Sequence, residues 1–188
     1  MNNLSQPEGS RWLGLSPVHW LVLSVVVGCG ARIYYTSIQA GLYFPDQLFQ
    51  YVEPGNFRAT GLGRLYWEFQ DGARNWILPW FWGALIKLLS PLHLTGWELY
   101  RVLAYFNAGL SLVLIPAAFR LGWALSRGRT DVAALTALVT AACPFICVLS
   151  GNTLSEVPAM VALTWAGALW IEDARLPASR WRGAWIGV

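Results

Sequence analysis

The sequence predicts an all-α, polytopic integral membrane protein. Of its 188 residues, 56% are hydrophobic and only 12% are charged, which is too little charge to cover the surface of a water-soluble protein. Twelve tryptophans gather at the ends of apolar runs, and indole rings prefer the membrane–water interface. The net charge of +3 is small and confined to particular loops, so the chain lacks the basic face that nucleic-acid binding requires. Membrane lipid is therefore an expected partner, and nucleic acid is not.

Five apolar stretches are candidates for membrane-spanning helices. They comprise residues 18–33, 76–92, 99–121, 132–149 and 157–171, and another begins at about residue 185. Stretches of about 17–23 residues are long enough to cross a hydrocarbon core of roughly 30 Å as helices. The first stretch precedes further spans, so we interpret it as a retained signal-anchor rather than a cleaved signal.

The arginine-rich loops decide which of these stretches cross the membrane. Short loops rich in arginine face the cytoplasm, and two such loops occur, at residues 120–129 and after residue 171. If all five stretches crossed from a cytoplasmic N-terminus, both loops would lie outside. Treating residues 76–92, which contain a lysine and two prolines, as an interfacial helix places both loops inside. The alternative, five spans from an external N-terminus, also satisfies both arginine-rich loops, but it would export Arg11 and place the acidic loop that contains Asp46 and Glu53 in the cytoplasm.

The first arrangement divides the chain into a cytoplasmic tail, residues 1–17, and the N-terminal part of a transmembrane domain, residues 18–188. Its spans are expected at about 18–33, 99–121, 132–149 and 157–171, with the next beginning at about 185. Residues 34–98 form one long external loop with the interfacial helix at about 76–92. Because an apolar stretch starts where the sequence stops, we expect the chain to be part of a longer membrane protein.

The external loop is too long for an unstructured connector, so it is expected to contain helices of its own. Residues Asp46 to Glu53 are typical of a short helix in which Asp46 is the N-cap or a first-turn residue. Regular helical spacing would place Asp46, Gln50 and Glu53 along one edge, since seven residues make two turns.

The motifs of this loop resemble glycosyltransferase family 22, the lipid-linked mannosyltransferases of GPI-anchor and N-glycan assembly, which belong to the GT-C superfamily. The resemblance rests on FPDQLFQYVEP, YWEF and ARNWILP within residues 44–79, and on SGNTLSE at residues 150–156. The family pattern has His at the position of Phe44, Glu at that of Gln47 and Ser at that of Asn75.

The resemblance implies a GT-C-type helical bundle whose long first extracytoplasmic loop contains juxtamembrane helices and carries the catalytic site. It implies transfer of a hexose, mannose-like, from a polyprenyl-phosphate sugar donor to a hydroxyl of a glycan or glycolipid acceptor. The site would face the extracytoplasmic side of a bacterial inner membrane or the lumen of the ER membrane. Asp46 would be the general base of an inverting displacement. No cofactor is expected, and participation of a divalent metal is left open.

Further residues are assigned to substrate binding in this scheme. Arg74, with Arg58 and Arg64 as alternatives, would pair with the donor phosphate, because a guanidinium offers a fork of donors. The others would bind sugar hydroxyls, stack on the sugar or orient the base, and they are Gln47, Gln50, Glu53, Trp67, Glu68, Asn152 and Glu156. The structural alternatives are that Asp46 merely caps a helix and that Glu156 is an ordinary first-turn acid.

A non-catalytic membrane protein, such as a transporter fragment or an assembly subunit, is the alternative from a different class. A transporter places charges or broken helices at mid-membrane, whereas the charges here gather in the external loop and at helix ends. No metal site is predicted, because Cys143 and Cys147 supply only two thiols on one helix face and both histidines lie far from them in sequence. These cysteines and Cys29 are expected to be small buried hydrophobes.

Overall fold

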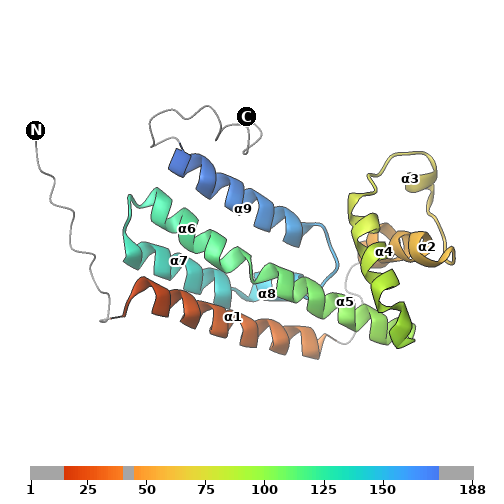
Figure 1. The fold of residues 1–188 in the computed structure, drawn as a ribbon, viewed down its shortest axis with the longest axis horizontal. Helices are drawn as coiled ribbons and strands as arrows, with labels where there is room; N and C mark the ends of the chain where they lie inside the picture. Colours follow the sequence, from red (N-terminus) through yellow and green to blue (C-terminus); the bar gives the residue numbers. More distant parts are fainter. Residues whose placement is uncertain (1–14, 40–44, 174–188) are drawn as a thin grey trace, which may run out of the picture. The chain divides into compact units, whose positions relative to one another are not determined.

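The computed structural model describes residues 15–39 and 45–173, and these residues form helices and turns with no strand among them (Figure 1). Two helical stretches are long and apolar enough to cross a membrane, Pro17–Ile38 and Gly96–Leu125. The pair Thr130–Ala142 and Pro144–Ser150 adds a third candidate, bent by 54°. The predicted class, an all-α membrane protein, is therefore confirmed. The predicted cytoplasmic tail, up to residue 14, and the predicted span beginning at about residue 185 lie outside the described residues.

The chain divides into two compact units, each built from segments that are distant in sequence. Among the described residues, unit 1 consists of residues 15–31, 111–147 and 158–173, and unit 2 of residues 32–39, 45–110 and 148–157. The helix α1 (Pro17–Ile38) contributes to both units. Unit 2 contains most of the motifs that predicted the catalytic loop.

Unit 1 is built around close packing of α6 (Leu114–Leu125) on α7 (Thr130–Ala142). Ala133, Ala137 and Ala141 recur every four residues on α7 and are all fully buried. On α6, a Cβ added at Gly122 would lie 2.7 Å from Thr136 Oγ1, so glycine is needed there. Small residues at both sides of a crossing let helix backbones approach closely, as is common in membrane helices.

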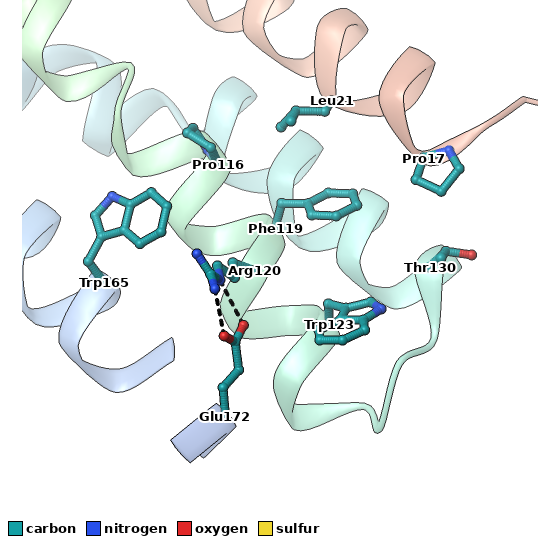
Figure 2. A pocket seen from close by; sticks show the side chains of 9 residues that line it. All are labelled: Pro17, Leu21, Pro116, Phe119, Arg120, Trp123, Thr130, Trp165 and Glu172. Atoms are coloured by element: carbon teal, nitrogen blue, oxygen red, sulfur yellow. Dashed lines mark hydrogen bonds and ion pairs between the residues drawn. The ribbon is translucent and has the colours of Figure 1, made fainter. Parts of the chain in front are cut away.

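A cavity of about 740 Å³ opens among the helices of unit 1. Its lining is mostly apolar and aromatic, with one charged pair (Figure 2). Arg120 on α6 donates through two nitrogens to the two carboxylate oxygens of Glu172, each at 2.8 Å. The guanidinium carbon of Arg120 also lies 5.7 Å from the centre of the Trp165 ring. Both Trp165 and Glu172 belong to α9 (Glu156–Asp173), so these contacts join α6 to α9.

Unit 2 contains the helices of the predicted external loop. They are η2 (Gln47–Val52), α2 (Glu53–Thr60), α3 (Trp67–Gln70), α4 (Ile77–Leu89) and η3 (Ser90–Leu92). Most of α5 (Gly96–Ser111), which falls largely in the predicted span 99–121, also belongs to unit 2. The end of α8 (Pro144–Ser150) and the segment that follows it complete the unit. Val52, Trp82, Ile86 and Leu103 form its apolar core, which draws on η2, α4 and α5.

Helix α4 has two apolar faces. Its 13 residues span about 20 Å at about 1.5 Å per residue, which is short of a hydrocarbon core of roughly 30 Å. One face, which includes Trp82 and Ile86, is buried in unit 2, while Ile77, Trp80 and Leu88 are exposed. A short helix with an exposed apolar face fits the interfacial helix predicted here, although its place in a membrane stays a prediction.

Candidate functional site

Asp46 lies at the start of an unusual helical turn. The η2 segment is a π-helix, and the backbone N–H of Glu53 donates to the carbonyl of Leu48, five residues earlier. Pro54 explains the wide turn, because proline has no N–H and its ring would clash with the carbonyl of Gln50 in an α-helix. Asp46 has helical φ and ψ of −59° and −29° and makes no capping hydrogen bond, so it is a first-turn residue rather than an N-cap.

The π-helix separates residues that regular helical spacing would align. In a π-helix each backbone N–H donates to the carbonyl five residues earlier, so each turn contains more residues than in an α-helix. Seven residues therefore make fewer than two turns. The expectation that Asp46, Gln50 and Glu53 share one edge is therefore wrong. Glu53 instead accepts hydrogen bonds from the backbone N–H of Arg64 and the hydroxyl of Tyr66, both at 3.2 Å. Desolvation and the Glu53 carboxylate raise the pKa of Tyr66, so its hydroxyl keeps the proton that it donates.

Gln47 and Asn152 are fully buried and bonded to each other across 105 residues of sequence. The amide nitrogen of Gln47 donates to Asn152 Oδ1 at 2.5 Å. The carbonyl oxygen of Gln47 accepts a hydrogen bond from the hydroxyl of Tyr100. Asn152 Nδ2 donates to the carbonyl of Val148 at 2.6 Å. Two residues predicted to bind substrate thus meet in the interior, and their contact with a sugar stays a prediction.

The segment that carries Asn152 is held from two further directions. Asn107 Nδ2 on α5 donates to the backbone carbonyls of Asn152, at 2.5 Å, and Ser150, at 3.1 Å. A Cβ added at Gly151 would lie 2.5 Å from Gln39 Oε1 and 3.0 Å from Thr36 Oγ1, so a larger residue there would have to displace the Gln39 side chain. The glycine of the SGN motif therefore lets this segment pack closely against Thr36 and Gln39.

A second side-chain pair runs parallel to the first. The hydroxyl of Tyr51 donates to Ser155 Oγ at 3.0 Å. Tyr51 lies four residues after Gln47, and Ser155 lies three residues after Asn152. The η2 turn and residues 152–155 therefore run side by side in the same direction. Glu156 follows directly, is exposed, and has no hydrogen-bond partner among the described residues.

The acids and cations farther along the loop form local pairs. Arg74 Nε donates to Glu68 Oε2 at 3.0 Å, and the backbone N–H of Arg74 donates to the Glu68 carbonyl at 3.1 Å. These contacts close the loop after α3 and leave the terminal guanidinium nitrogens of Arg74 available. Trp67 is 64% exposed and presents its ring to the surroundings.

Arg58 is held by aromatic rings rather than by a carboxylate. Its guanidinium carbon lies 4.4 Å from the centre of the Trp76 ring and 5.2 Å from that of Trp80. Within the part of the chain that the structure describes, no acid lies within 4.0 Å of its nitrogens. Arg58 is therefore a second cation whose donors are unused among the described residues. It thus meets the requirement for its predicted role as an alternative to Arg74 in binding the donor phosphate.

Asp46 and Gln50 are the predicted site residues of the η2 turn that make no side-chain hydrogen bond among the described residues. Asp46 is exposed and has no hydrogen-bond partner among residues 15–39 and 45–173, while Gln50 is partly buried and likewise without one. Reasoning from sequence missed Tyr100 and Asn107. A signal existed for Asn107, since a polar side chain inside an apolar run is costly in a membrane and usually has a partner. Tyr100 gave no such signal.

Metal ligands do not cluster in the described residues. No group of three or more His, Cys, Asp or Glu side chains there is arranged to hold a metal ion. Cys147 is buried, as expected, whereas Cys29 and Cys143 are partly exposed. Participation of a metal thus stays open for the residues outside this description.

Comparison with known proteins identifies similar enzymes. The chain is 26% identical over 87 residues to GPI mannosyltransferase 3 of Candida glabrata, which covers 46% of this chain and 14% of that protein. The chain is similar to a mannosyltransferase. It is also 26% identical over 111 residues to GPI mannosyltransferase 3 of Saccharomyces cerevisiae, covering 59% of this chain and 17% of that protein. The predicted resemblance to a mannosyltransferase is thereby confirmed.

The chain spans only about a sixth of the length of the curated relatives that it matches, between 14% and 17%. No family model and no solved structure matches it.

Proposed function

We propose that this chain belongs to a membrane glycosyltransferase that moves a hexose, mannose-like, from a polyprenyl-phosphate sugar to a hydroxyl of a glycan or glycolipid acceptor. Two independent findings support the proposal: similarity to GPI mannosyltransferase 3, and apolar helices that offer a hydrocarbon environment for a lipid-linked donor. The catalytic loop would lie on the extracytoplasmic or luminal face, as the positions of the arginine-rich loops predict.

Asp46 is the proposed general base, and its geometry is the observation that carries the mechanism. Its carboxylate is exposed and unpaired among the described residues, while the next residue, Gln47, is fully buried and held at both ends of its amide. A carboxylate without a partner is free to accept a proton, and a fixed turn holds it in one place.

The reaction would be a single displacement at the anomeric carbon of the sugar. The acceptor oxygen forms a bond to C1 as the bond from C1 to the phosphate oxygen breaks. The proton of the acceptor hydroxyl passes to Asp46, and polyprenyl phosphate leaves as an anion. Because the acceptor attacks opposite the leaving group, the configuration at C1 inverts.

The departing phosphate requires positive charge, and two arginines of unit 2 are suited to supply it. Arg74 uses only its Nε on Glu68, so its two terminal nitrogens can bind a phosphate in a forked arrangement. Arg58 has no hydrogen-bond or ion-pair partner among residues 15–39 and 45–173, and it is oriented by two tryptophan rings. The exposed ring of Trp67 offers a flat apolar surface on which a sugar can stack.

The base assignment is tested by Asp46→Asn in the full-length protein, reconstituted with a polyprenyl-phosphate mannose donor. We expect transfer to fall at least about a hundredfold, the range typical of a lost general base. Asp71→Asn is the matched control, since Asp71 is also an exposed acid of unit 2 whose carboxylate has no partner among the described residues. Near wild-type transfer by Asp46→Asn, with folding intact, would remove the base assignment, whereas no transfer by the wild type would favour the non-catalytic alternative.

A further inference from the structure

One face of α5 holds both segments of the candidate site. Tyr100 and Asn107 are seven residues apart on α5, which is about two turns, so both side chains point to the same side. The hydroxyl of Tyr100 donates to Gln47 on η2. Asn107 donates to the backbone of Asn152 and Ser150, at 2.5 and 3.1 Å. All these side chains are buried.

The orientation of the Gln47 side chain is determined by its two partners. The side-chain NH₂ group of Gln47 donates to Oδ1 of the Asn152 side chain, and the side-chain carbonyl oxygen of Gln47 accepts from the hydroxyl of Tyr100. Turning the amide over would bring two carbonyl oxygens together, and turning it away would leave buried donors and acceptors unpaired. The Tyr100 hydroxyl therefore selects the amide orientation that joins η2 to Asn152.

Asp46 depends on this arrangement because its side chain makes no hydrogen bond of its own among the described residues. Its own carboxylate has no partner among the described residues, so its position follows from the backbone of the turn that Gln47 anchors. A misplacement of about 1 Å of a reacting group can cost a hundredfold in rate. An interaction that sets the position of the turn therefore acts on catalysis without touching substrate.

We propose that Tyr100 and Asn107 are positioning residues, which hold Gln47 and Asn152 in register and thereby fix the Asp46 carboxylate against the acceptor hydroxyl. This inference rests on the proposed function, in which Asp46 is the base. It assigns α5, the first part of the candidate membrane-spanning stretch Gly96–Leu125, the role of aligning the two segments of the site.

The test is Tyr100→Phe in the reconstituted full-length enzyme. The substitution removes one hydroxyl and keeps the ring, which stacks on Trp97 with centroids 5.6 Å apart. We expect kcat to fall about tenfold, the cost of one buried hydrogen bond, while KM for the donor changes less than about twofold. Amide hydrogen exchange should become faster over η2 and residues 150–155. Tyr105→Phe is the control, because Tyr105 is exposed on the same helix without a hydrogen-bond partner among the described residues.

A double variant separates positioning from general stabilisation. If Tyr100 acts through Asp46, then adding Tyr100→Phe to Asp46→Asn should lower the residual rate no further. A full tenfold additional loss in the double variant would overturn the inference, as would wild-type kcat and exchange in Tyr100→Phe or an equal loss in Tyr105→Phe.

The Asp46→Asn single variant, measured alongside, distinguishes a failure of the proposed role of Asp46 from a failure of positioning by Tyr100. If it keeps wild-type transfer, the proposed function of Asp46 fails. If it loses transfer while Tyr100→Phe keeps it, the proposed function stands and positioning by Tyr100 is wrong.

Discussion

The crossing of α2 and α4 offers a sharp test of how unit 2 is packed, through the substitution Gly83→Ala. A Cβ at Gly83 would lie 2.7 Å from the carbonyl oxygen of Gly55. In return, a Cβ at Gly55 would lie 2.9 Å from the carbonyl oxygen of Pro79 and 3.0 Å from the backbone nitrogen of Gly83. The obstacles are backbone atoms on both sides, so no side chain can rotate away. The two helices would have to separate to restore ordinary contact.

The expected magnitude follows from two opposing effects. Overpacking a tight contact costs about 1–3 kcal/mol, while alanine in a helix is worth roughly 0.5–1 kcal/mol more than glycine. Gly83→Ala should therefore lower the free energy of unfolding by about 1–2 kcal/mol. Gly109→Ala is the matched control, because a Cβ at Gly109 on α5 meets no atom within 4 Å. It should raise stability by roughly 0.5–1 kcal/mol.

Thermal unfolding of the purified chain in detergent micelles measures both variants. Gly83→Ala should unfold several degrees below the wild type, at about 2–4 °C for each kcal/mol, and Gly109→Ala slightly above it. If Gly83→Ala were as stable as Gly109→Ala, the two helix backbones would not be in contact at these glycines, and the packing of unit 2 described here would be refuted.

Three further substitutions test the rest of the fold by the same measurement. Trp82→Ala should cost about 3–5 kcal/mol because that ring is buried in the core of unit 2, and a loss below 1 kcal/mol would contradict its burial. Gly122→Ala should cost about 1–2 kcal/mol by pressing α6 against Thr136, and unchanged stability would argue against close packing of α6 on α7. Glu172→Gln should weaken the contact with Arg120 by about 0.5–1 kcal/mol, as expected of a partly exposed ion pair, and the loss should shrink in high salt.

Composition and hydropathy were sufficient to predict the class of the protein. Low charge, many tryptophans and long apolar runs depend only on local sequence, and they correctly indicated an all-α membrane protein. The short helix at Asp46 was also predicted, because its apolar spacing is local. Its geometry was not, because the effect of Pro54 on the preceding turn shifts Glu53 away from Asp46.

The contacts that organise the site join residues far apart in the chain. Gln47 and Asn152 were both identified as candidate residues, but no periodicity relates positions separated by 105 residues. Tyr100 was missed for the same reason, since its partner lies 53 residues earlier. The pairing of Arg74 with Glu68 is local, yet the sequence alone did not show that Arg74 pairs with a carboxylate. Nor did it show that Arg58, an alternative phosphate-binding residue, is held by two tryptophan rings.

The most direct test of the central claim is a transfer assay with defined lipid-linked sugars. The full-length protein, purified and reconstituted in lipid nanodiscs, would be given polyprenyl-phosphate mannose and a glycolipid acceptor, and the product linkage would be determined by NMR. The account predicts release of polyprenyl phosphate and one new glycosidic bond whose anomeric configuration is opposite to that of the donor. Transfer with retained configuration would contradict Asp46 as a general base, and no transfer from any polyprenyl-phosphate sugar would contradict the proposed function itself.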